Sequence, residues 1–381
     1  YTPTVVGLAF LLALIPPILT DYNFTMWINR ALVFLVSSCP CALVISIPLG
    51  FFGGIGGASR NGILIKGGNY LETLSKVGYV VFDKTGTLTK GNFKVVDIRV
   101  NKYSKDELLE YTSLAEAFST HPIALSIKEE YAKEIDIKRV KDVQEIAGIG
   151  ISAVVDDKKV YVGNEKMLAK FKIKSEINTT GTVINTVIDG VYAGSVVISD
   201  EVKKESKEAI ELLKKDYNIK TIMLTGDNLA VAKEVGDELG IDDIRADLLP
   251  DEKAEIVQEI IKSKDVNKKV AFVGDGINDA PVLSIADIGI AMGAMGSDAA
   301  IEAADIVLMD DNPRKVMSAI KVAKKTMNVV MQNIVFAIGV KILVMVLGAF
   351  GIANIQAGIF ADMGVTVIAI LNSSRTLMLK E

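Results

Sequence analysis

Hydrophobic residues gather in four long runs, two near each end of the chain. The runs cover residues 4–20, about 31–59, about 329–350 and about 352–371. Each approaches the roughly 20 residues that a helix needs to cross a bilayer. Short connections at residues 21–29 and around Gly351 pair the runs into two helical hairpins. Because each hairpin leaves and re-enters on the same side, the charged middle of the chain is expected on one face of the membrane.

Between the hairpins, short apolar segments alternate with amphipathic ones. Strands are predicted at residues 77–82, 221–224 and 270–273, and each runs into a polar motif. Helices are predicted at residues 201–216 and 250–264. This alternation indicates a parallel, doubly wound sheet, whose ligands gather at the carboxyl ends of the strands.

A different pattern interrupts the sheet between about residues 91 and 199. Helices predicted near residues 105–134 are followed by short alternating strands, of which 182–188 and 191–198 flank Asp189-Gly190. An Asp-Gly pair between such strands is a strong signal of a β-hairpin. We therefore expect an α+β domain inserted within the parallel-sheet domain.

Composition narrows the class of protein. The 381 residues exceed one ordinary domain, and the net charge of −5 disfavours a nucleic-acid partner, which requires clustered Lys and Arg. The only two cysteines, Cys39 and Cys41, are too close to staple distant segments. Residues 1–20 lack the features of a signal peptide, and a start without Met suggests a chain that begins partway through a longer protein.

The run DKTGTLT begins at Asp83, where the first predicted strand ends. A carboxylate before a glycine-containing loop is suited to attack a phosphoryl group while backbone N–H groups hold its oxygens. For a lone aspartate, a capping role in a polar loop is the usual alternative. The seven-residue run resembles the signature of the P-type ATPases, a branch of the haloacid dehalogenase superfamily. The resemblance implies that Asp83 becomes phosphorylated by ATP. Related phosphatases commonly carry an acid where Thr85 stands, so Thr85 favours a long-lived phosphoenzyme.

A second polar motif, GDGIND at residues 274–279, places Asp275 and Asp279 four residues apart at another strand end. Such oxygen ligands suit Mg²⁺, although a polar surface loop is an alternative. The resemblance implies a Mg²⁺ region made by Asp83, Thr85, Asp275 and Asp279. It further implies catalytic or phosphate-contacting roles for Lys84, Thr225, Asp227, Lys253 and Asn278.

The single histidine, His121, would by itself more often be structural. Together with Glu116, Gly148, Gly150 and Asn164 it resembles the nucleotide-binding pattern of heavy-metal-transporting P-type ATPases. The resemblance implies that His121 and Glu116 orient the adenine, and that the glycines let the backbone approach the nucleotide. No GxxxxGK[ST] motif is present, so a P-loop enzyme is not supported.

Cys39 and Cys41 flank Pro40 inside a membrane-length run. Proline there opens a gap in the helix, and two sulfurs form a soft site for Zn²⁺, Cd²⁺, Pb²⁺ or Cu⁺. The alternative is that both cysteines are small apolar packing residues.

Lys341 and Asp362 lie on successive runs at depths that let them meet, and each charge costs on the order of 3 kcal/mol at a helix centre. A carboxylate beside thiolates favours a divalent ion over Cu⁺, with Lys341 as counter-ion; a purely structural ion pair is the alternative. By resemblance, the lysine and the Asp-x-Gly motif are typical of zinc, cadmium and lead exporters.

Taken together, the resemblance implies ATP-driven efflux of Zn²⁺ or Cd²⁺, and of Pb²⁺ as a further candidate, with ATP and Mg²⁺ as cofactors. It also implies a multi-pass, monomeric protein of the cell membrane with membrane lipid around it and its catalytic domains in the cytoplasm. The expected domains are a membrane hairpin at residues 1–59, a phosphorylation domain at 60–95 and 199–320, a nucleotide-binding domain at 96–198 and a second membrane hairpin at 326–376. Cu⁺ transport, a membrane-anchored phosphatase and a non-catalytic metal-binding fragment are the alternatives.

The resemblance leaves two gaps. The Thr-Gly-Glu loop and the early membrane spans of the family are absent from these residues. Asp200 is followed by Lys203 where the family more often has Arg, which leaves that nucleotide or phosphate contact open.

Overall fold

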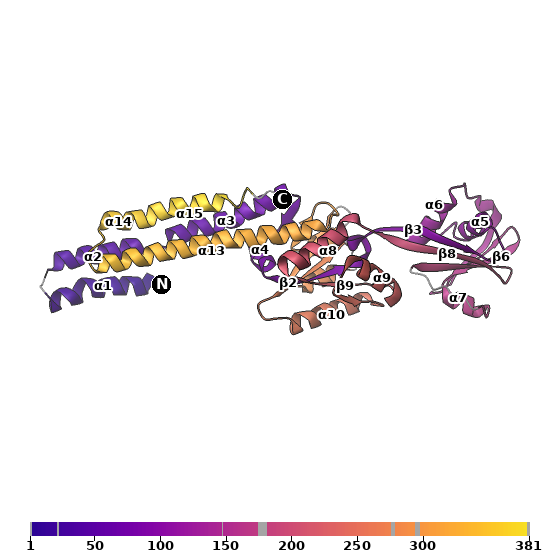
Figure 1. Ribbon diagram of the computed structural model, residues 1–381, viewed down its shortest axis with the longest axis horizontal. Helices are drawn as coiled ribbons and strands as arrows, with labels where there is room; N and C mark the ends of the chain where they lie inside the picture. The colour runs from indigo at the N-terminus through magenta and orange to yellow at the C-terminus, as the bar shows by residue number, and fades with distance from the viewer. Residues whose placement is uncertain are drawn as a thin grey trace.

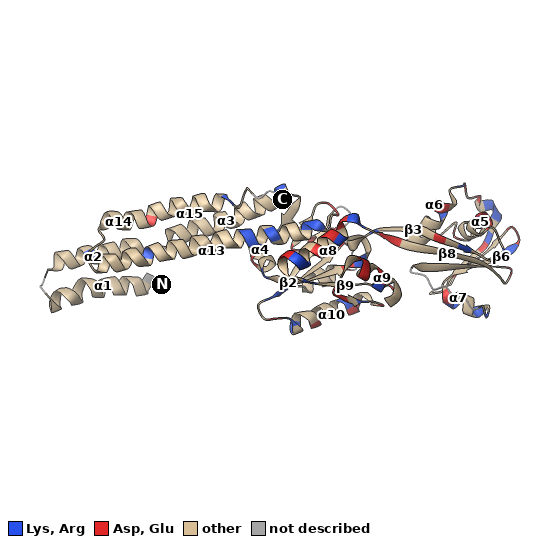
Figure 2. Cartoon of the chain, in the orientation of Figure 1, with Lys and Arg blue, Asp and Glu red and all other residues tan. Residues whose placement is uncertain are grey.

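The chain forms a bundle of membrane-length helices, a parallel sheet and an antiparallel sheet, arranged along one long axis (Figure 1). The structure is a computed structural model that describes residues 2–20, 23–146, 148–173, 181–275, 279–293 and 298–378. Charged residues are dense over the two sheets and sparse along the helical bundle (Figure 2). Both hairpins turn at the end of the bundle far from the sheets (Figure 1), so the sheets lie on one side of it, as the sequence predicted.

The bundle is built from α1 (Thr2–Leu19), α2 (Phe24–Ser38), α3 (Cys41–Arg60), α13 (Arg314–Ala349), α14 (Ile355–Ile359) and α15 (Val365–Ser374). Among the described residues, three helical stretches are long and apolar enough to cross a membrane: Phe24–Arg60, Arg314–Ala349 and Ile355–Ser374. The stretch predicted to begin at about residue 31 begins earlier, at Phe24, because the polar Asn29 and Arg30 lie inside α2 and Asn23 caps its start.

Two of the membrane helices are irregular at the same level of the bundle. Pro40 separates the end of α2 from the start of α3. A π-helical turn, Phe360–Gly364, joins α14 to α15 and contacts both α2 and α3. Irregular backbone inside a bilayer is tolerated where protein surrounds it, and π-turns frequently mark functional sites.

The parallel sheet has seven strands in the order β1-β13-β12-β11-β2-β9-β10. Their bounds are β1 (Ile63–Ile65), β2 (Val77–Asp83), β9 (Lys220–Leu224), β10 (Asp243–Arg245), β11 (Lys269–Gly274), β12 (Ile288–Met292) and β13 (Ile306–Leu308). All neighbours are parallel except β1 and β13. The accompanying helices are α4 (Gly68–Ser75), α8 (Lys204–Tyr217), α9 (Leu229–Leu239), α10 (Pro250–Ser263), α11 (Ala280–Ile285) and α12 (Asp298–Ala303). The predicted doubly wound sheet is confirmed.

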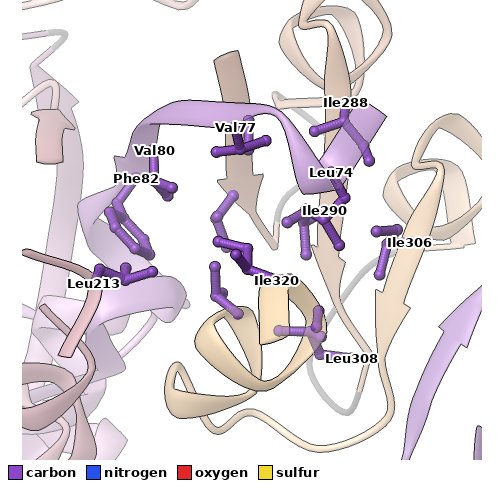
Figure 3. Close-up of a cluster of buried hydrophobic side chains, with 14 of the residues drawn as sticks. Leu74, Val77, Val80, Phe82, Leu213, Ile288, Ile290, Ile306, Leu308 and Ile320 are labelled. Carbon is purple, nitrogen blue, oxygen red and sulfur yellow. The ribbon is translucent and has the colours of Figure 1, made fainter. Parts of the chain in front are cut away.

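One face of this sheet forms a core with α8 and with the beginning of α13 (Figure 3). Phe82 of β2, Leu213 of α8 and Ile320 of α13 are all buried in it. Removing such a side chain from water stabilises a protein by about 1.5–3 kcal/mol. Because Ile320 belongs to the helix that continues into the bundle, the sheet is packed directly onto a membrane helix.

The antiparallel sheet has six strands in the order β3-β8-β7-β6-β5-β4. Its elements are β3 (Thr89–Val100), β4 (Val140–Ile146), β5 (Gly150–Val155), β6 (Lys158–Gly163), β7 (Thr182–Ile188), β8 (Val191–Val202), α5 (Lys105–Ala115), α6 (Pro122–Tyr131) and α7 (Glu165–Lys170). The predicted hairpin is confirmed, because β7 pairs with β8 through Asp189 and Gly190, both at positive φ.

Strands β3 and β8 connect the two sheets. The predicted domain limits at residues 95/96 and 198/199 fall inside these strands, so the division at those positions stays a prediction. The helix expected from residue 201 begins later, at Lys204, because β8 pairs with β3 as far as Val202.

Candidate functional site

The carboxyl ends of β2 and β11 bring four of the predicted residues together. Asp83 ends β2, Asp275 follows β11, and Lys253 reaches in from the first turn of α10. The Lys253 Nζ lies 2.5 Å from Asp83 Oδ1 and 3.1 Å from Asp279 Oδ1. Carboxylate oxygens of Asp83, Asp275 and Asp279 all lie within 4.8 Å of one another.

This cluster holds more negative than positive charge in a buried place. Burial, followed by repulsion from Asp279, raises the pKa of Asp83 to about 7, although Lys253 opposes the change. Burial and Asp279 likewise raise the pKa of Asp275 to about 6. Burial disfavours the charged form of Lys253, but Asp83 and Asp279 outweigh it and raise the pKa of this lysine. A hard divalent cation would relieve this repulsion, and the carboxylate oxygens are the ligands that Mg²⁺ prefers.

The loop after Asp83 depends on a glycine. Gly86 has a φ of +73°, and a Cβ built on it would lie 1.6 Å from Asp275 Oδ2. The carboxylate of Asp275 therefore occupies the space that any side chain at position 86 needs. In the same loop, Thr87 Oγ1 is buried and has no hydrogen-bond partner in the described part of the chain.

The other predicted catalytic residues do not all lie in this cluster. Lys84 is buried and forms an ion pair with Asp227. Thr225 Oγ1 donates to Asp227 Oδ2 over 3.0 Å and accepts from the Asp227 N–H over 3.1 Å. Thr85 is exposed, and Asn278 lies outside the described residues. The roles of all these residues stay predictions.

Lys203, for which the sequence left a nucleotide or phosphate contact open, contacts the loop after Asp83 in the structure. Its side chain is buried, and its Nζ donates to the Gly86 carbonyl over 2.5 Å. Burial lowers the pKa of this lysine. Nearby, the buried carboxylate of Asp200 accepts a hydrogen bond from Thr89 Oγ1. The spacing of Asp200 and Lys203 was the signal in the sequence that pointed to this lysine. Its contact with the Gly86 carbonyl follows only from the fold.

All five residues predicted to bind nucleotide line one pocket of about 300 Å³ beside α6: Glu116, His121, Gly148, Gly150 and Asn164. His121 caps α6, since its Nδ1 accepts from the Ile123 N–H over 3.3 Å. Asn164 Nδ2 donates to the Gly148 carbonyl over 3.0 Å. Burial raises the pKa of Glu116. Sequence reasoning therefore placed these residues at a common cavity, while their contacts with a nucleotide stay a prediction.

The third predicted site lies in the bundle, where Pro40 faces the π-turn of Phe360–Gly364. The sulfurs of Cys39 and Cys41 and a carboxylate oxygen of Asp362 lie within 4.8 Å of one another. Lys341 Nζ donates to Asp362 Oδ1 over 3.1 Å, so the pairing of Lys341 with Asp362 predicted from their depths is confirmed.

The sequence prediction of two free thiols differs from the structure, in which Cys39 and Cys41 are joined as a disulfide. Their Cα atoms are 5.5 Å apart, a separation that suits a disulfide. Both sulfurs therefore lie on the same side of the chain. Thiolates, and not a disulfide, bind metal ions. The soft site therefore requires the reduced pair.

A polar network between α3, α13 and α15 was not predicted. Asn333 Nδ2 donates to Ser373 Oγ over 2.8 Å, and Asn372 Nδ2 donates to Asn333 Oδ1 over 2.9 Å. Ser373 Oγ in turn donates to the Ser46 carbonyl over 2.9 Å. Isolated Asn and Ser residues within apolar runs were the available signal, because buried polar groups in a bilayer need partners.

Comparisons with known proteins agree with this arrangement. Residues 77–287 match the family of haloacid dehalogenase-like hydrolases. A zinc-transporting ATPase from Synechocystis sp. is 51% identical over 98% of this chain and 52% of its own length. A cadmium, zinc and cobalt-transporting ATPase from Bacillus subtilis is 49% identical over 100% of this chain and 55% of its own.

Among solved structures, a zinc-transporting PIB-type ATPase in the E2.Pi state superposes with a TM-score of 0.83 at 34% identity, covering 99% of this chain and 62% of that one. The chain therefore belongs to the haloacid dehalogenase-like hydrolases, in the branch of heavy-metal-transporting P-type ATPases. It spans about half the length of the curated relatives it matches.

Proposed function

We propose that the protein uses ATP to phosphorylate Asp83 and thereby exports a soft divalent metal ion, with Zn²⁺ and Cd²⁺ as the best candidates and Pb²⁺ as a further one. The observation that carries this proposal is the membrane cluster of Cys39, Cys41 and Asp362, with Lys341 on the carboxylate. The relatives named for zinc and cadmium transport support it. The protein would act as a monomer in the cell membrane, with both sheets on the cytoplasmic side.

At the catalytic cluster, the carboxylate of Asp83 would attack the terminal phosphorus of ATP, and ADP would leave. Lys253 lies beside the attacking carboxylate of Asp83 and would stabilise the charge on the transferred group. Asp83, Asp275 and Asp279 would hold Mg²⁺, and the bound ion would offset repulsion between carboxylate and triphosphate. In the pocket beside α6, Glu116 and His121 would orient the adenine.

Thr85 favours a pump over a phosphatase. Its side chain is exposed beside Asp83, and a hydroxyl is no general base at neutral pH. The phosphoenzyme would therefore persist long enough to drive a change of conformation. A phosphatase would instead require a group at this position that activates water.

The ligand chemistry favours a divalent ion over Cu⁺. Thiolates select soft metals, while a carboxylate adds a hard ligand and a further negative charge. When the metal site is empty, Lys341 would neutralise Asp362, since a lone charge inside the bilayer is costly. Arrival of the metal would displace this lysine from the carboxylate.

The test is metal-dependent phosphorylation of the full-length protein, measured with radiolabelled ATP under reducing conditions. We expect Zn²⁺ and Cd²⁺ to stimulate labelling of Asp83, and Cys39→Ala and Asp362→Ala to abolish the stimulation. Val44→Ala, at a lipid-facing position of α3, is the matched control and should behave like the wild type. Stimulation by Cu⁺ without stimulation by Zn²⁺ would overturn the choice of metal, and absence of labelling with any metal would overturn the pump.

A further inference from the structure

A pocket opens at the end of the bundle far from the sheets, between the start of α2 and the connection from α13 to α14 (Figure 1). Its volume is about 500 Å³. Four polar side chains are among its lining: Asn29, Arg30, Asn354 and Gln356. It has no part in the proposed chemistry, since it lies beyond Asp362 toward the opposite membrane surface.

Among the described residues that line the pocket, Arg30 alone carries a charge, and its guanidinium has only weak partners there. Its Nη1 donates to the Ala349 carbonyl over 3.5 Å, at the limit of hydrogen bonding, and its Nη2 donates over 3.6 Å to Met26 Sδ, a thioether sulfur that accepts only weakly. Within the part of the chain that the structure describes, no carboxylate lies within 4.0 Å of it. The positive charge is therefore available to an anion.

The guanidinium is nevertheless held in place. Its face stacks on the Trp27 ring, with Cζ 4.4 Å from the ring centre. Gly351, at a φ of +77°, leaves room for it, because a Cβ there would lie 2.5 Å from Arg30 Nη2. Stacking occupies the face of the group and leaves its N–H edge with only the two weak contacts to Ala349 and Met26. This edge is the one that binds oxyanions in a two-pronged manner.

The surroundings decide which oxyanion fits. Phe350 and Ile352 beside the pocket are each 73% exposed, and Ile28 of α2 is 47% exposed. A Trp and an Arg at the end of membrane helices are typical of the headgroup level of a bilayer. A lipid offers a phosphate at that level and acyl chains for the apolar side chains, whereas a free ion leaves these side chains uncovered.

We propose that this pocket binds the phosphodiester of an anionic phospholipid in the leaflet at the far end of the bundle. The Arg30 edge would hold two phosphate oxygens, and Asn29 and Gln356 would donate to the remaining headgroup oxygens. The acyl chains would run along the exposed side chains. An uncharged or zwitterionic headgroup would bind less well, because only a net negative charge offsets Arg30.

The test measures lipid retained by the full chain. The protein is placed in nanodiscs of equal phosphatidylglycerol and phosphatidylcholine, extracted in mild detergent and examined by native mass spectrometry. We expect the wild type to retain phosphatidylglycerol and Arg30→Gln to retain about tenfold less, the size of one charge-assisted hydrogen bond. Arg30→Lys should fall between them, because it keeps the charge and loses the two-pronged edge.

Arg375→Gln is the matched control, since this exposed arginine of the opposite end of the bundle already binds Asn372. It should retain as much phosphatidylglycerol as the wild type. Equal retention by Arg30→Gln would overturn the proposal. Displacement of the lipid by millimolar inorganic phosphate would show a free-anion site instead.

Discussion

At Gly86, a single added methyl group should lower the rate of phosphorylation much more than it lowers the stability of the fold. In Gly86→Ala the new Cβ would collide with the Asp275 carboxylate, and the loop would have to move. A displacement of about 1 Å at a reacting centre can cost roughly 100-fold in rate. We therefore expect phosphorylation of Asp83, measured with radiolabelled ATP, to fall by about that factor.

Gly240→Ala separates this collision from backbone strain. Gly240 has a nearly identical φ of +72°, but nothing lies within 4 Å of a Cβ built there. Both variants place an L residue at positive φ, although ψ is −23° at Gly86 and 36° at Gly240. Each change costs at least about 1–2 kcal/mol, which thermal unfolding would report. Only Gly86→Ala should lose phosphorylation. Equal losses in the two variants would mean that the contact with Asp275 is unimportant.

At the scale of elements, the junction of β8 and α8 is attached to the loop after Asp83 through Lys203. Lys203→Met would remove a buried charge-assisted hydrogen bond to the Gly86 carbonyl, an interaction of about 1.5–3 kcal/mol. If that energy positions the loop for the reaction, the rate of phosphorylation should fall about 10- to 100-fold. The affinity for ATP, measured separately by equilibrium binding, should stay within about twofold to threefold of the wild type, because the Glu116 pocket is untouched.

Two further variants test whether Lys203 acts by positioning the loop after Asp83. Lys203→Arg keeps the donor and should restore most of the rate. Lys204→Met removes the exposed neighbouring lysine and should change nothing. A merely structural role would lower protein stability and ATP affinity together, and Arg would then give no selective recovery of the rate.

The same elements show what a sequence reveals. The ends of β2 and β11 were predicted because apolar runs and polar motifs are local features, and the parallel sheet then brings Asp83 near Asp275. The pairing of Lys341 with Asp362 followed from their depths in apolar runs. The contact of Lys203 with the loop and the bonding of Asn333 could not be assigned in this way, because their partners are a carbonyl and a hydroxyl far along the chain. Backbone carbonyls leave no signature in a sequence.

On the scale of the whole molecule, α13 is the most direct connection between the two sites. Ile320 of this helix is buried in the core beneath β2 (Figure 3), while Lys341 of the same helix contacts Asp362. At 1.5 Å per residue, these two positions are roughly 32 Å apart along the axis. A stiff helix packed at both ends carries a displacement from one site to the other without a chain of weaker contacts.

Softening this helix between the sites should uncouple them. Lys325 and Asn328 are exposed positions between the core and the bundle, so glycine there disturbs the helix and little else. Each glycine costs about 1 kcal/mol relative to alanine and loosens the backbone. In the double Gly variant we expect metal binding and ATP binding to persist, while metal no longer stimulates phosphorylation. The double Ala variant has the same side chains removed and a stiff helix, so it should keep the stimulation. If both variants respond to metal alike, the signal travels through α3, whose end also packs against the parallel sheet, and not through α13.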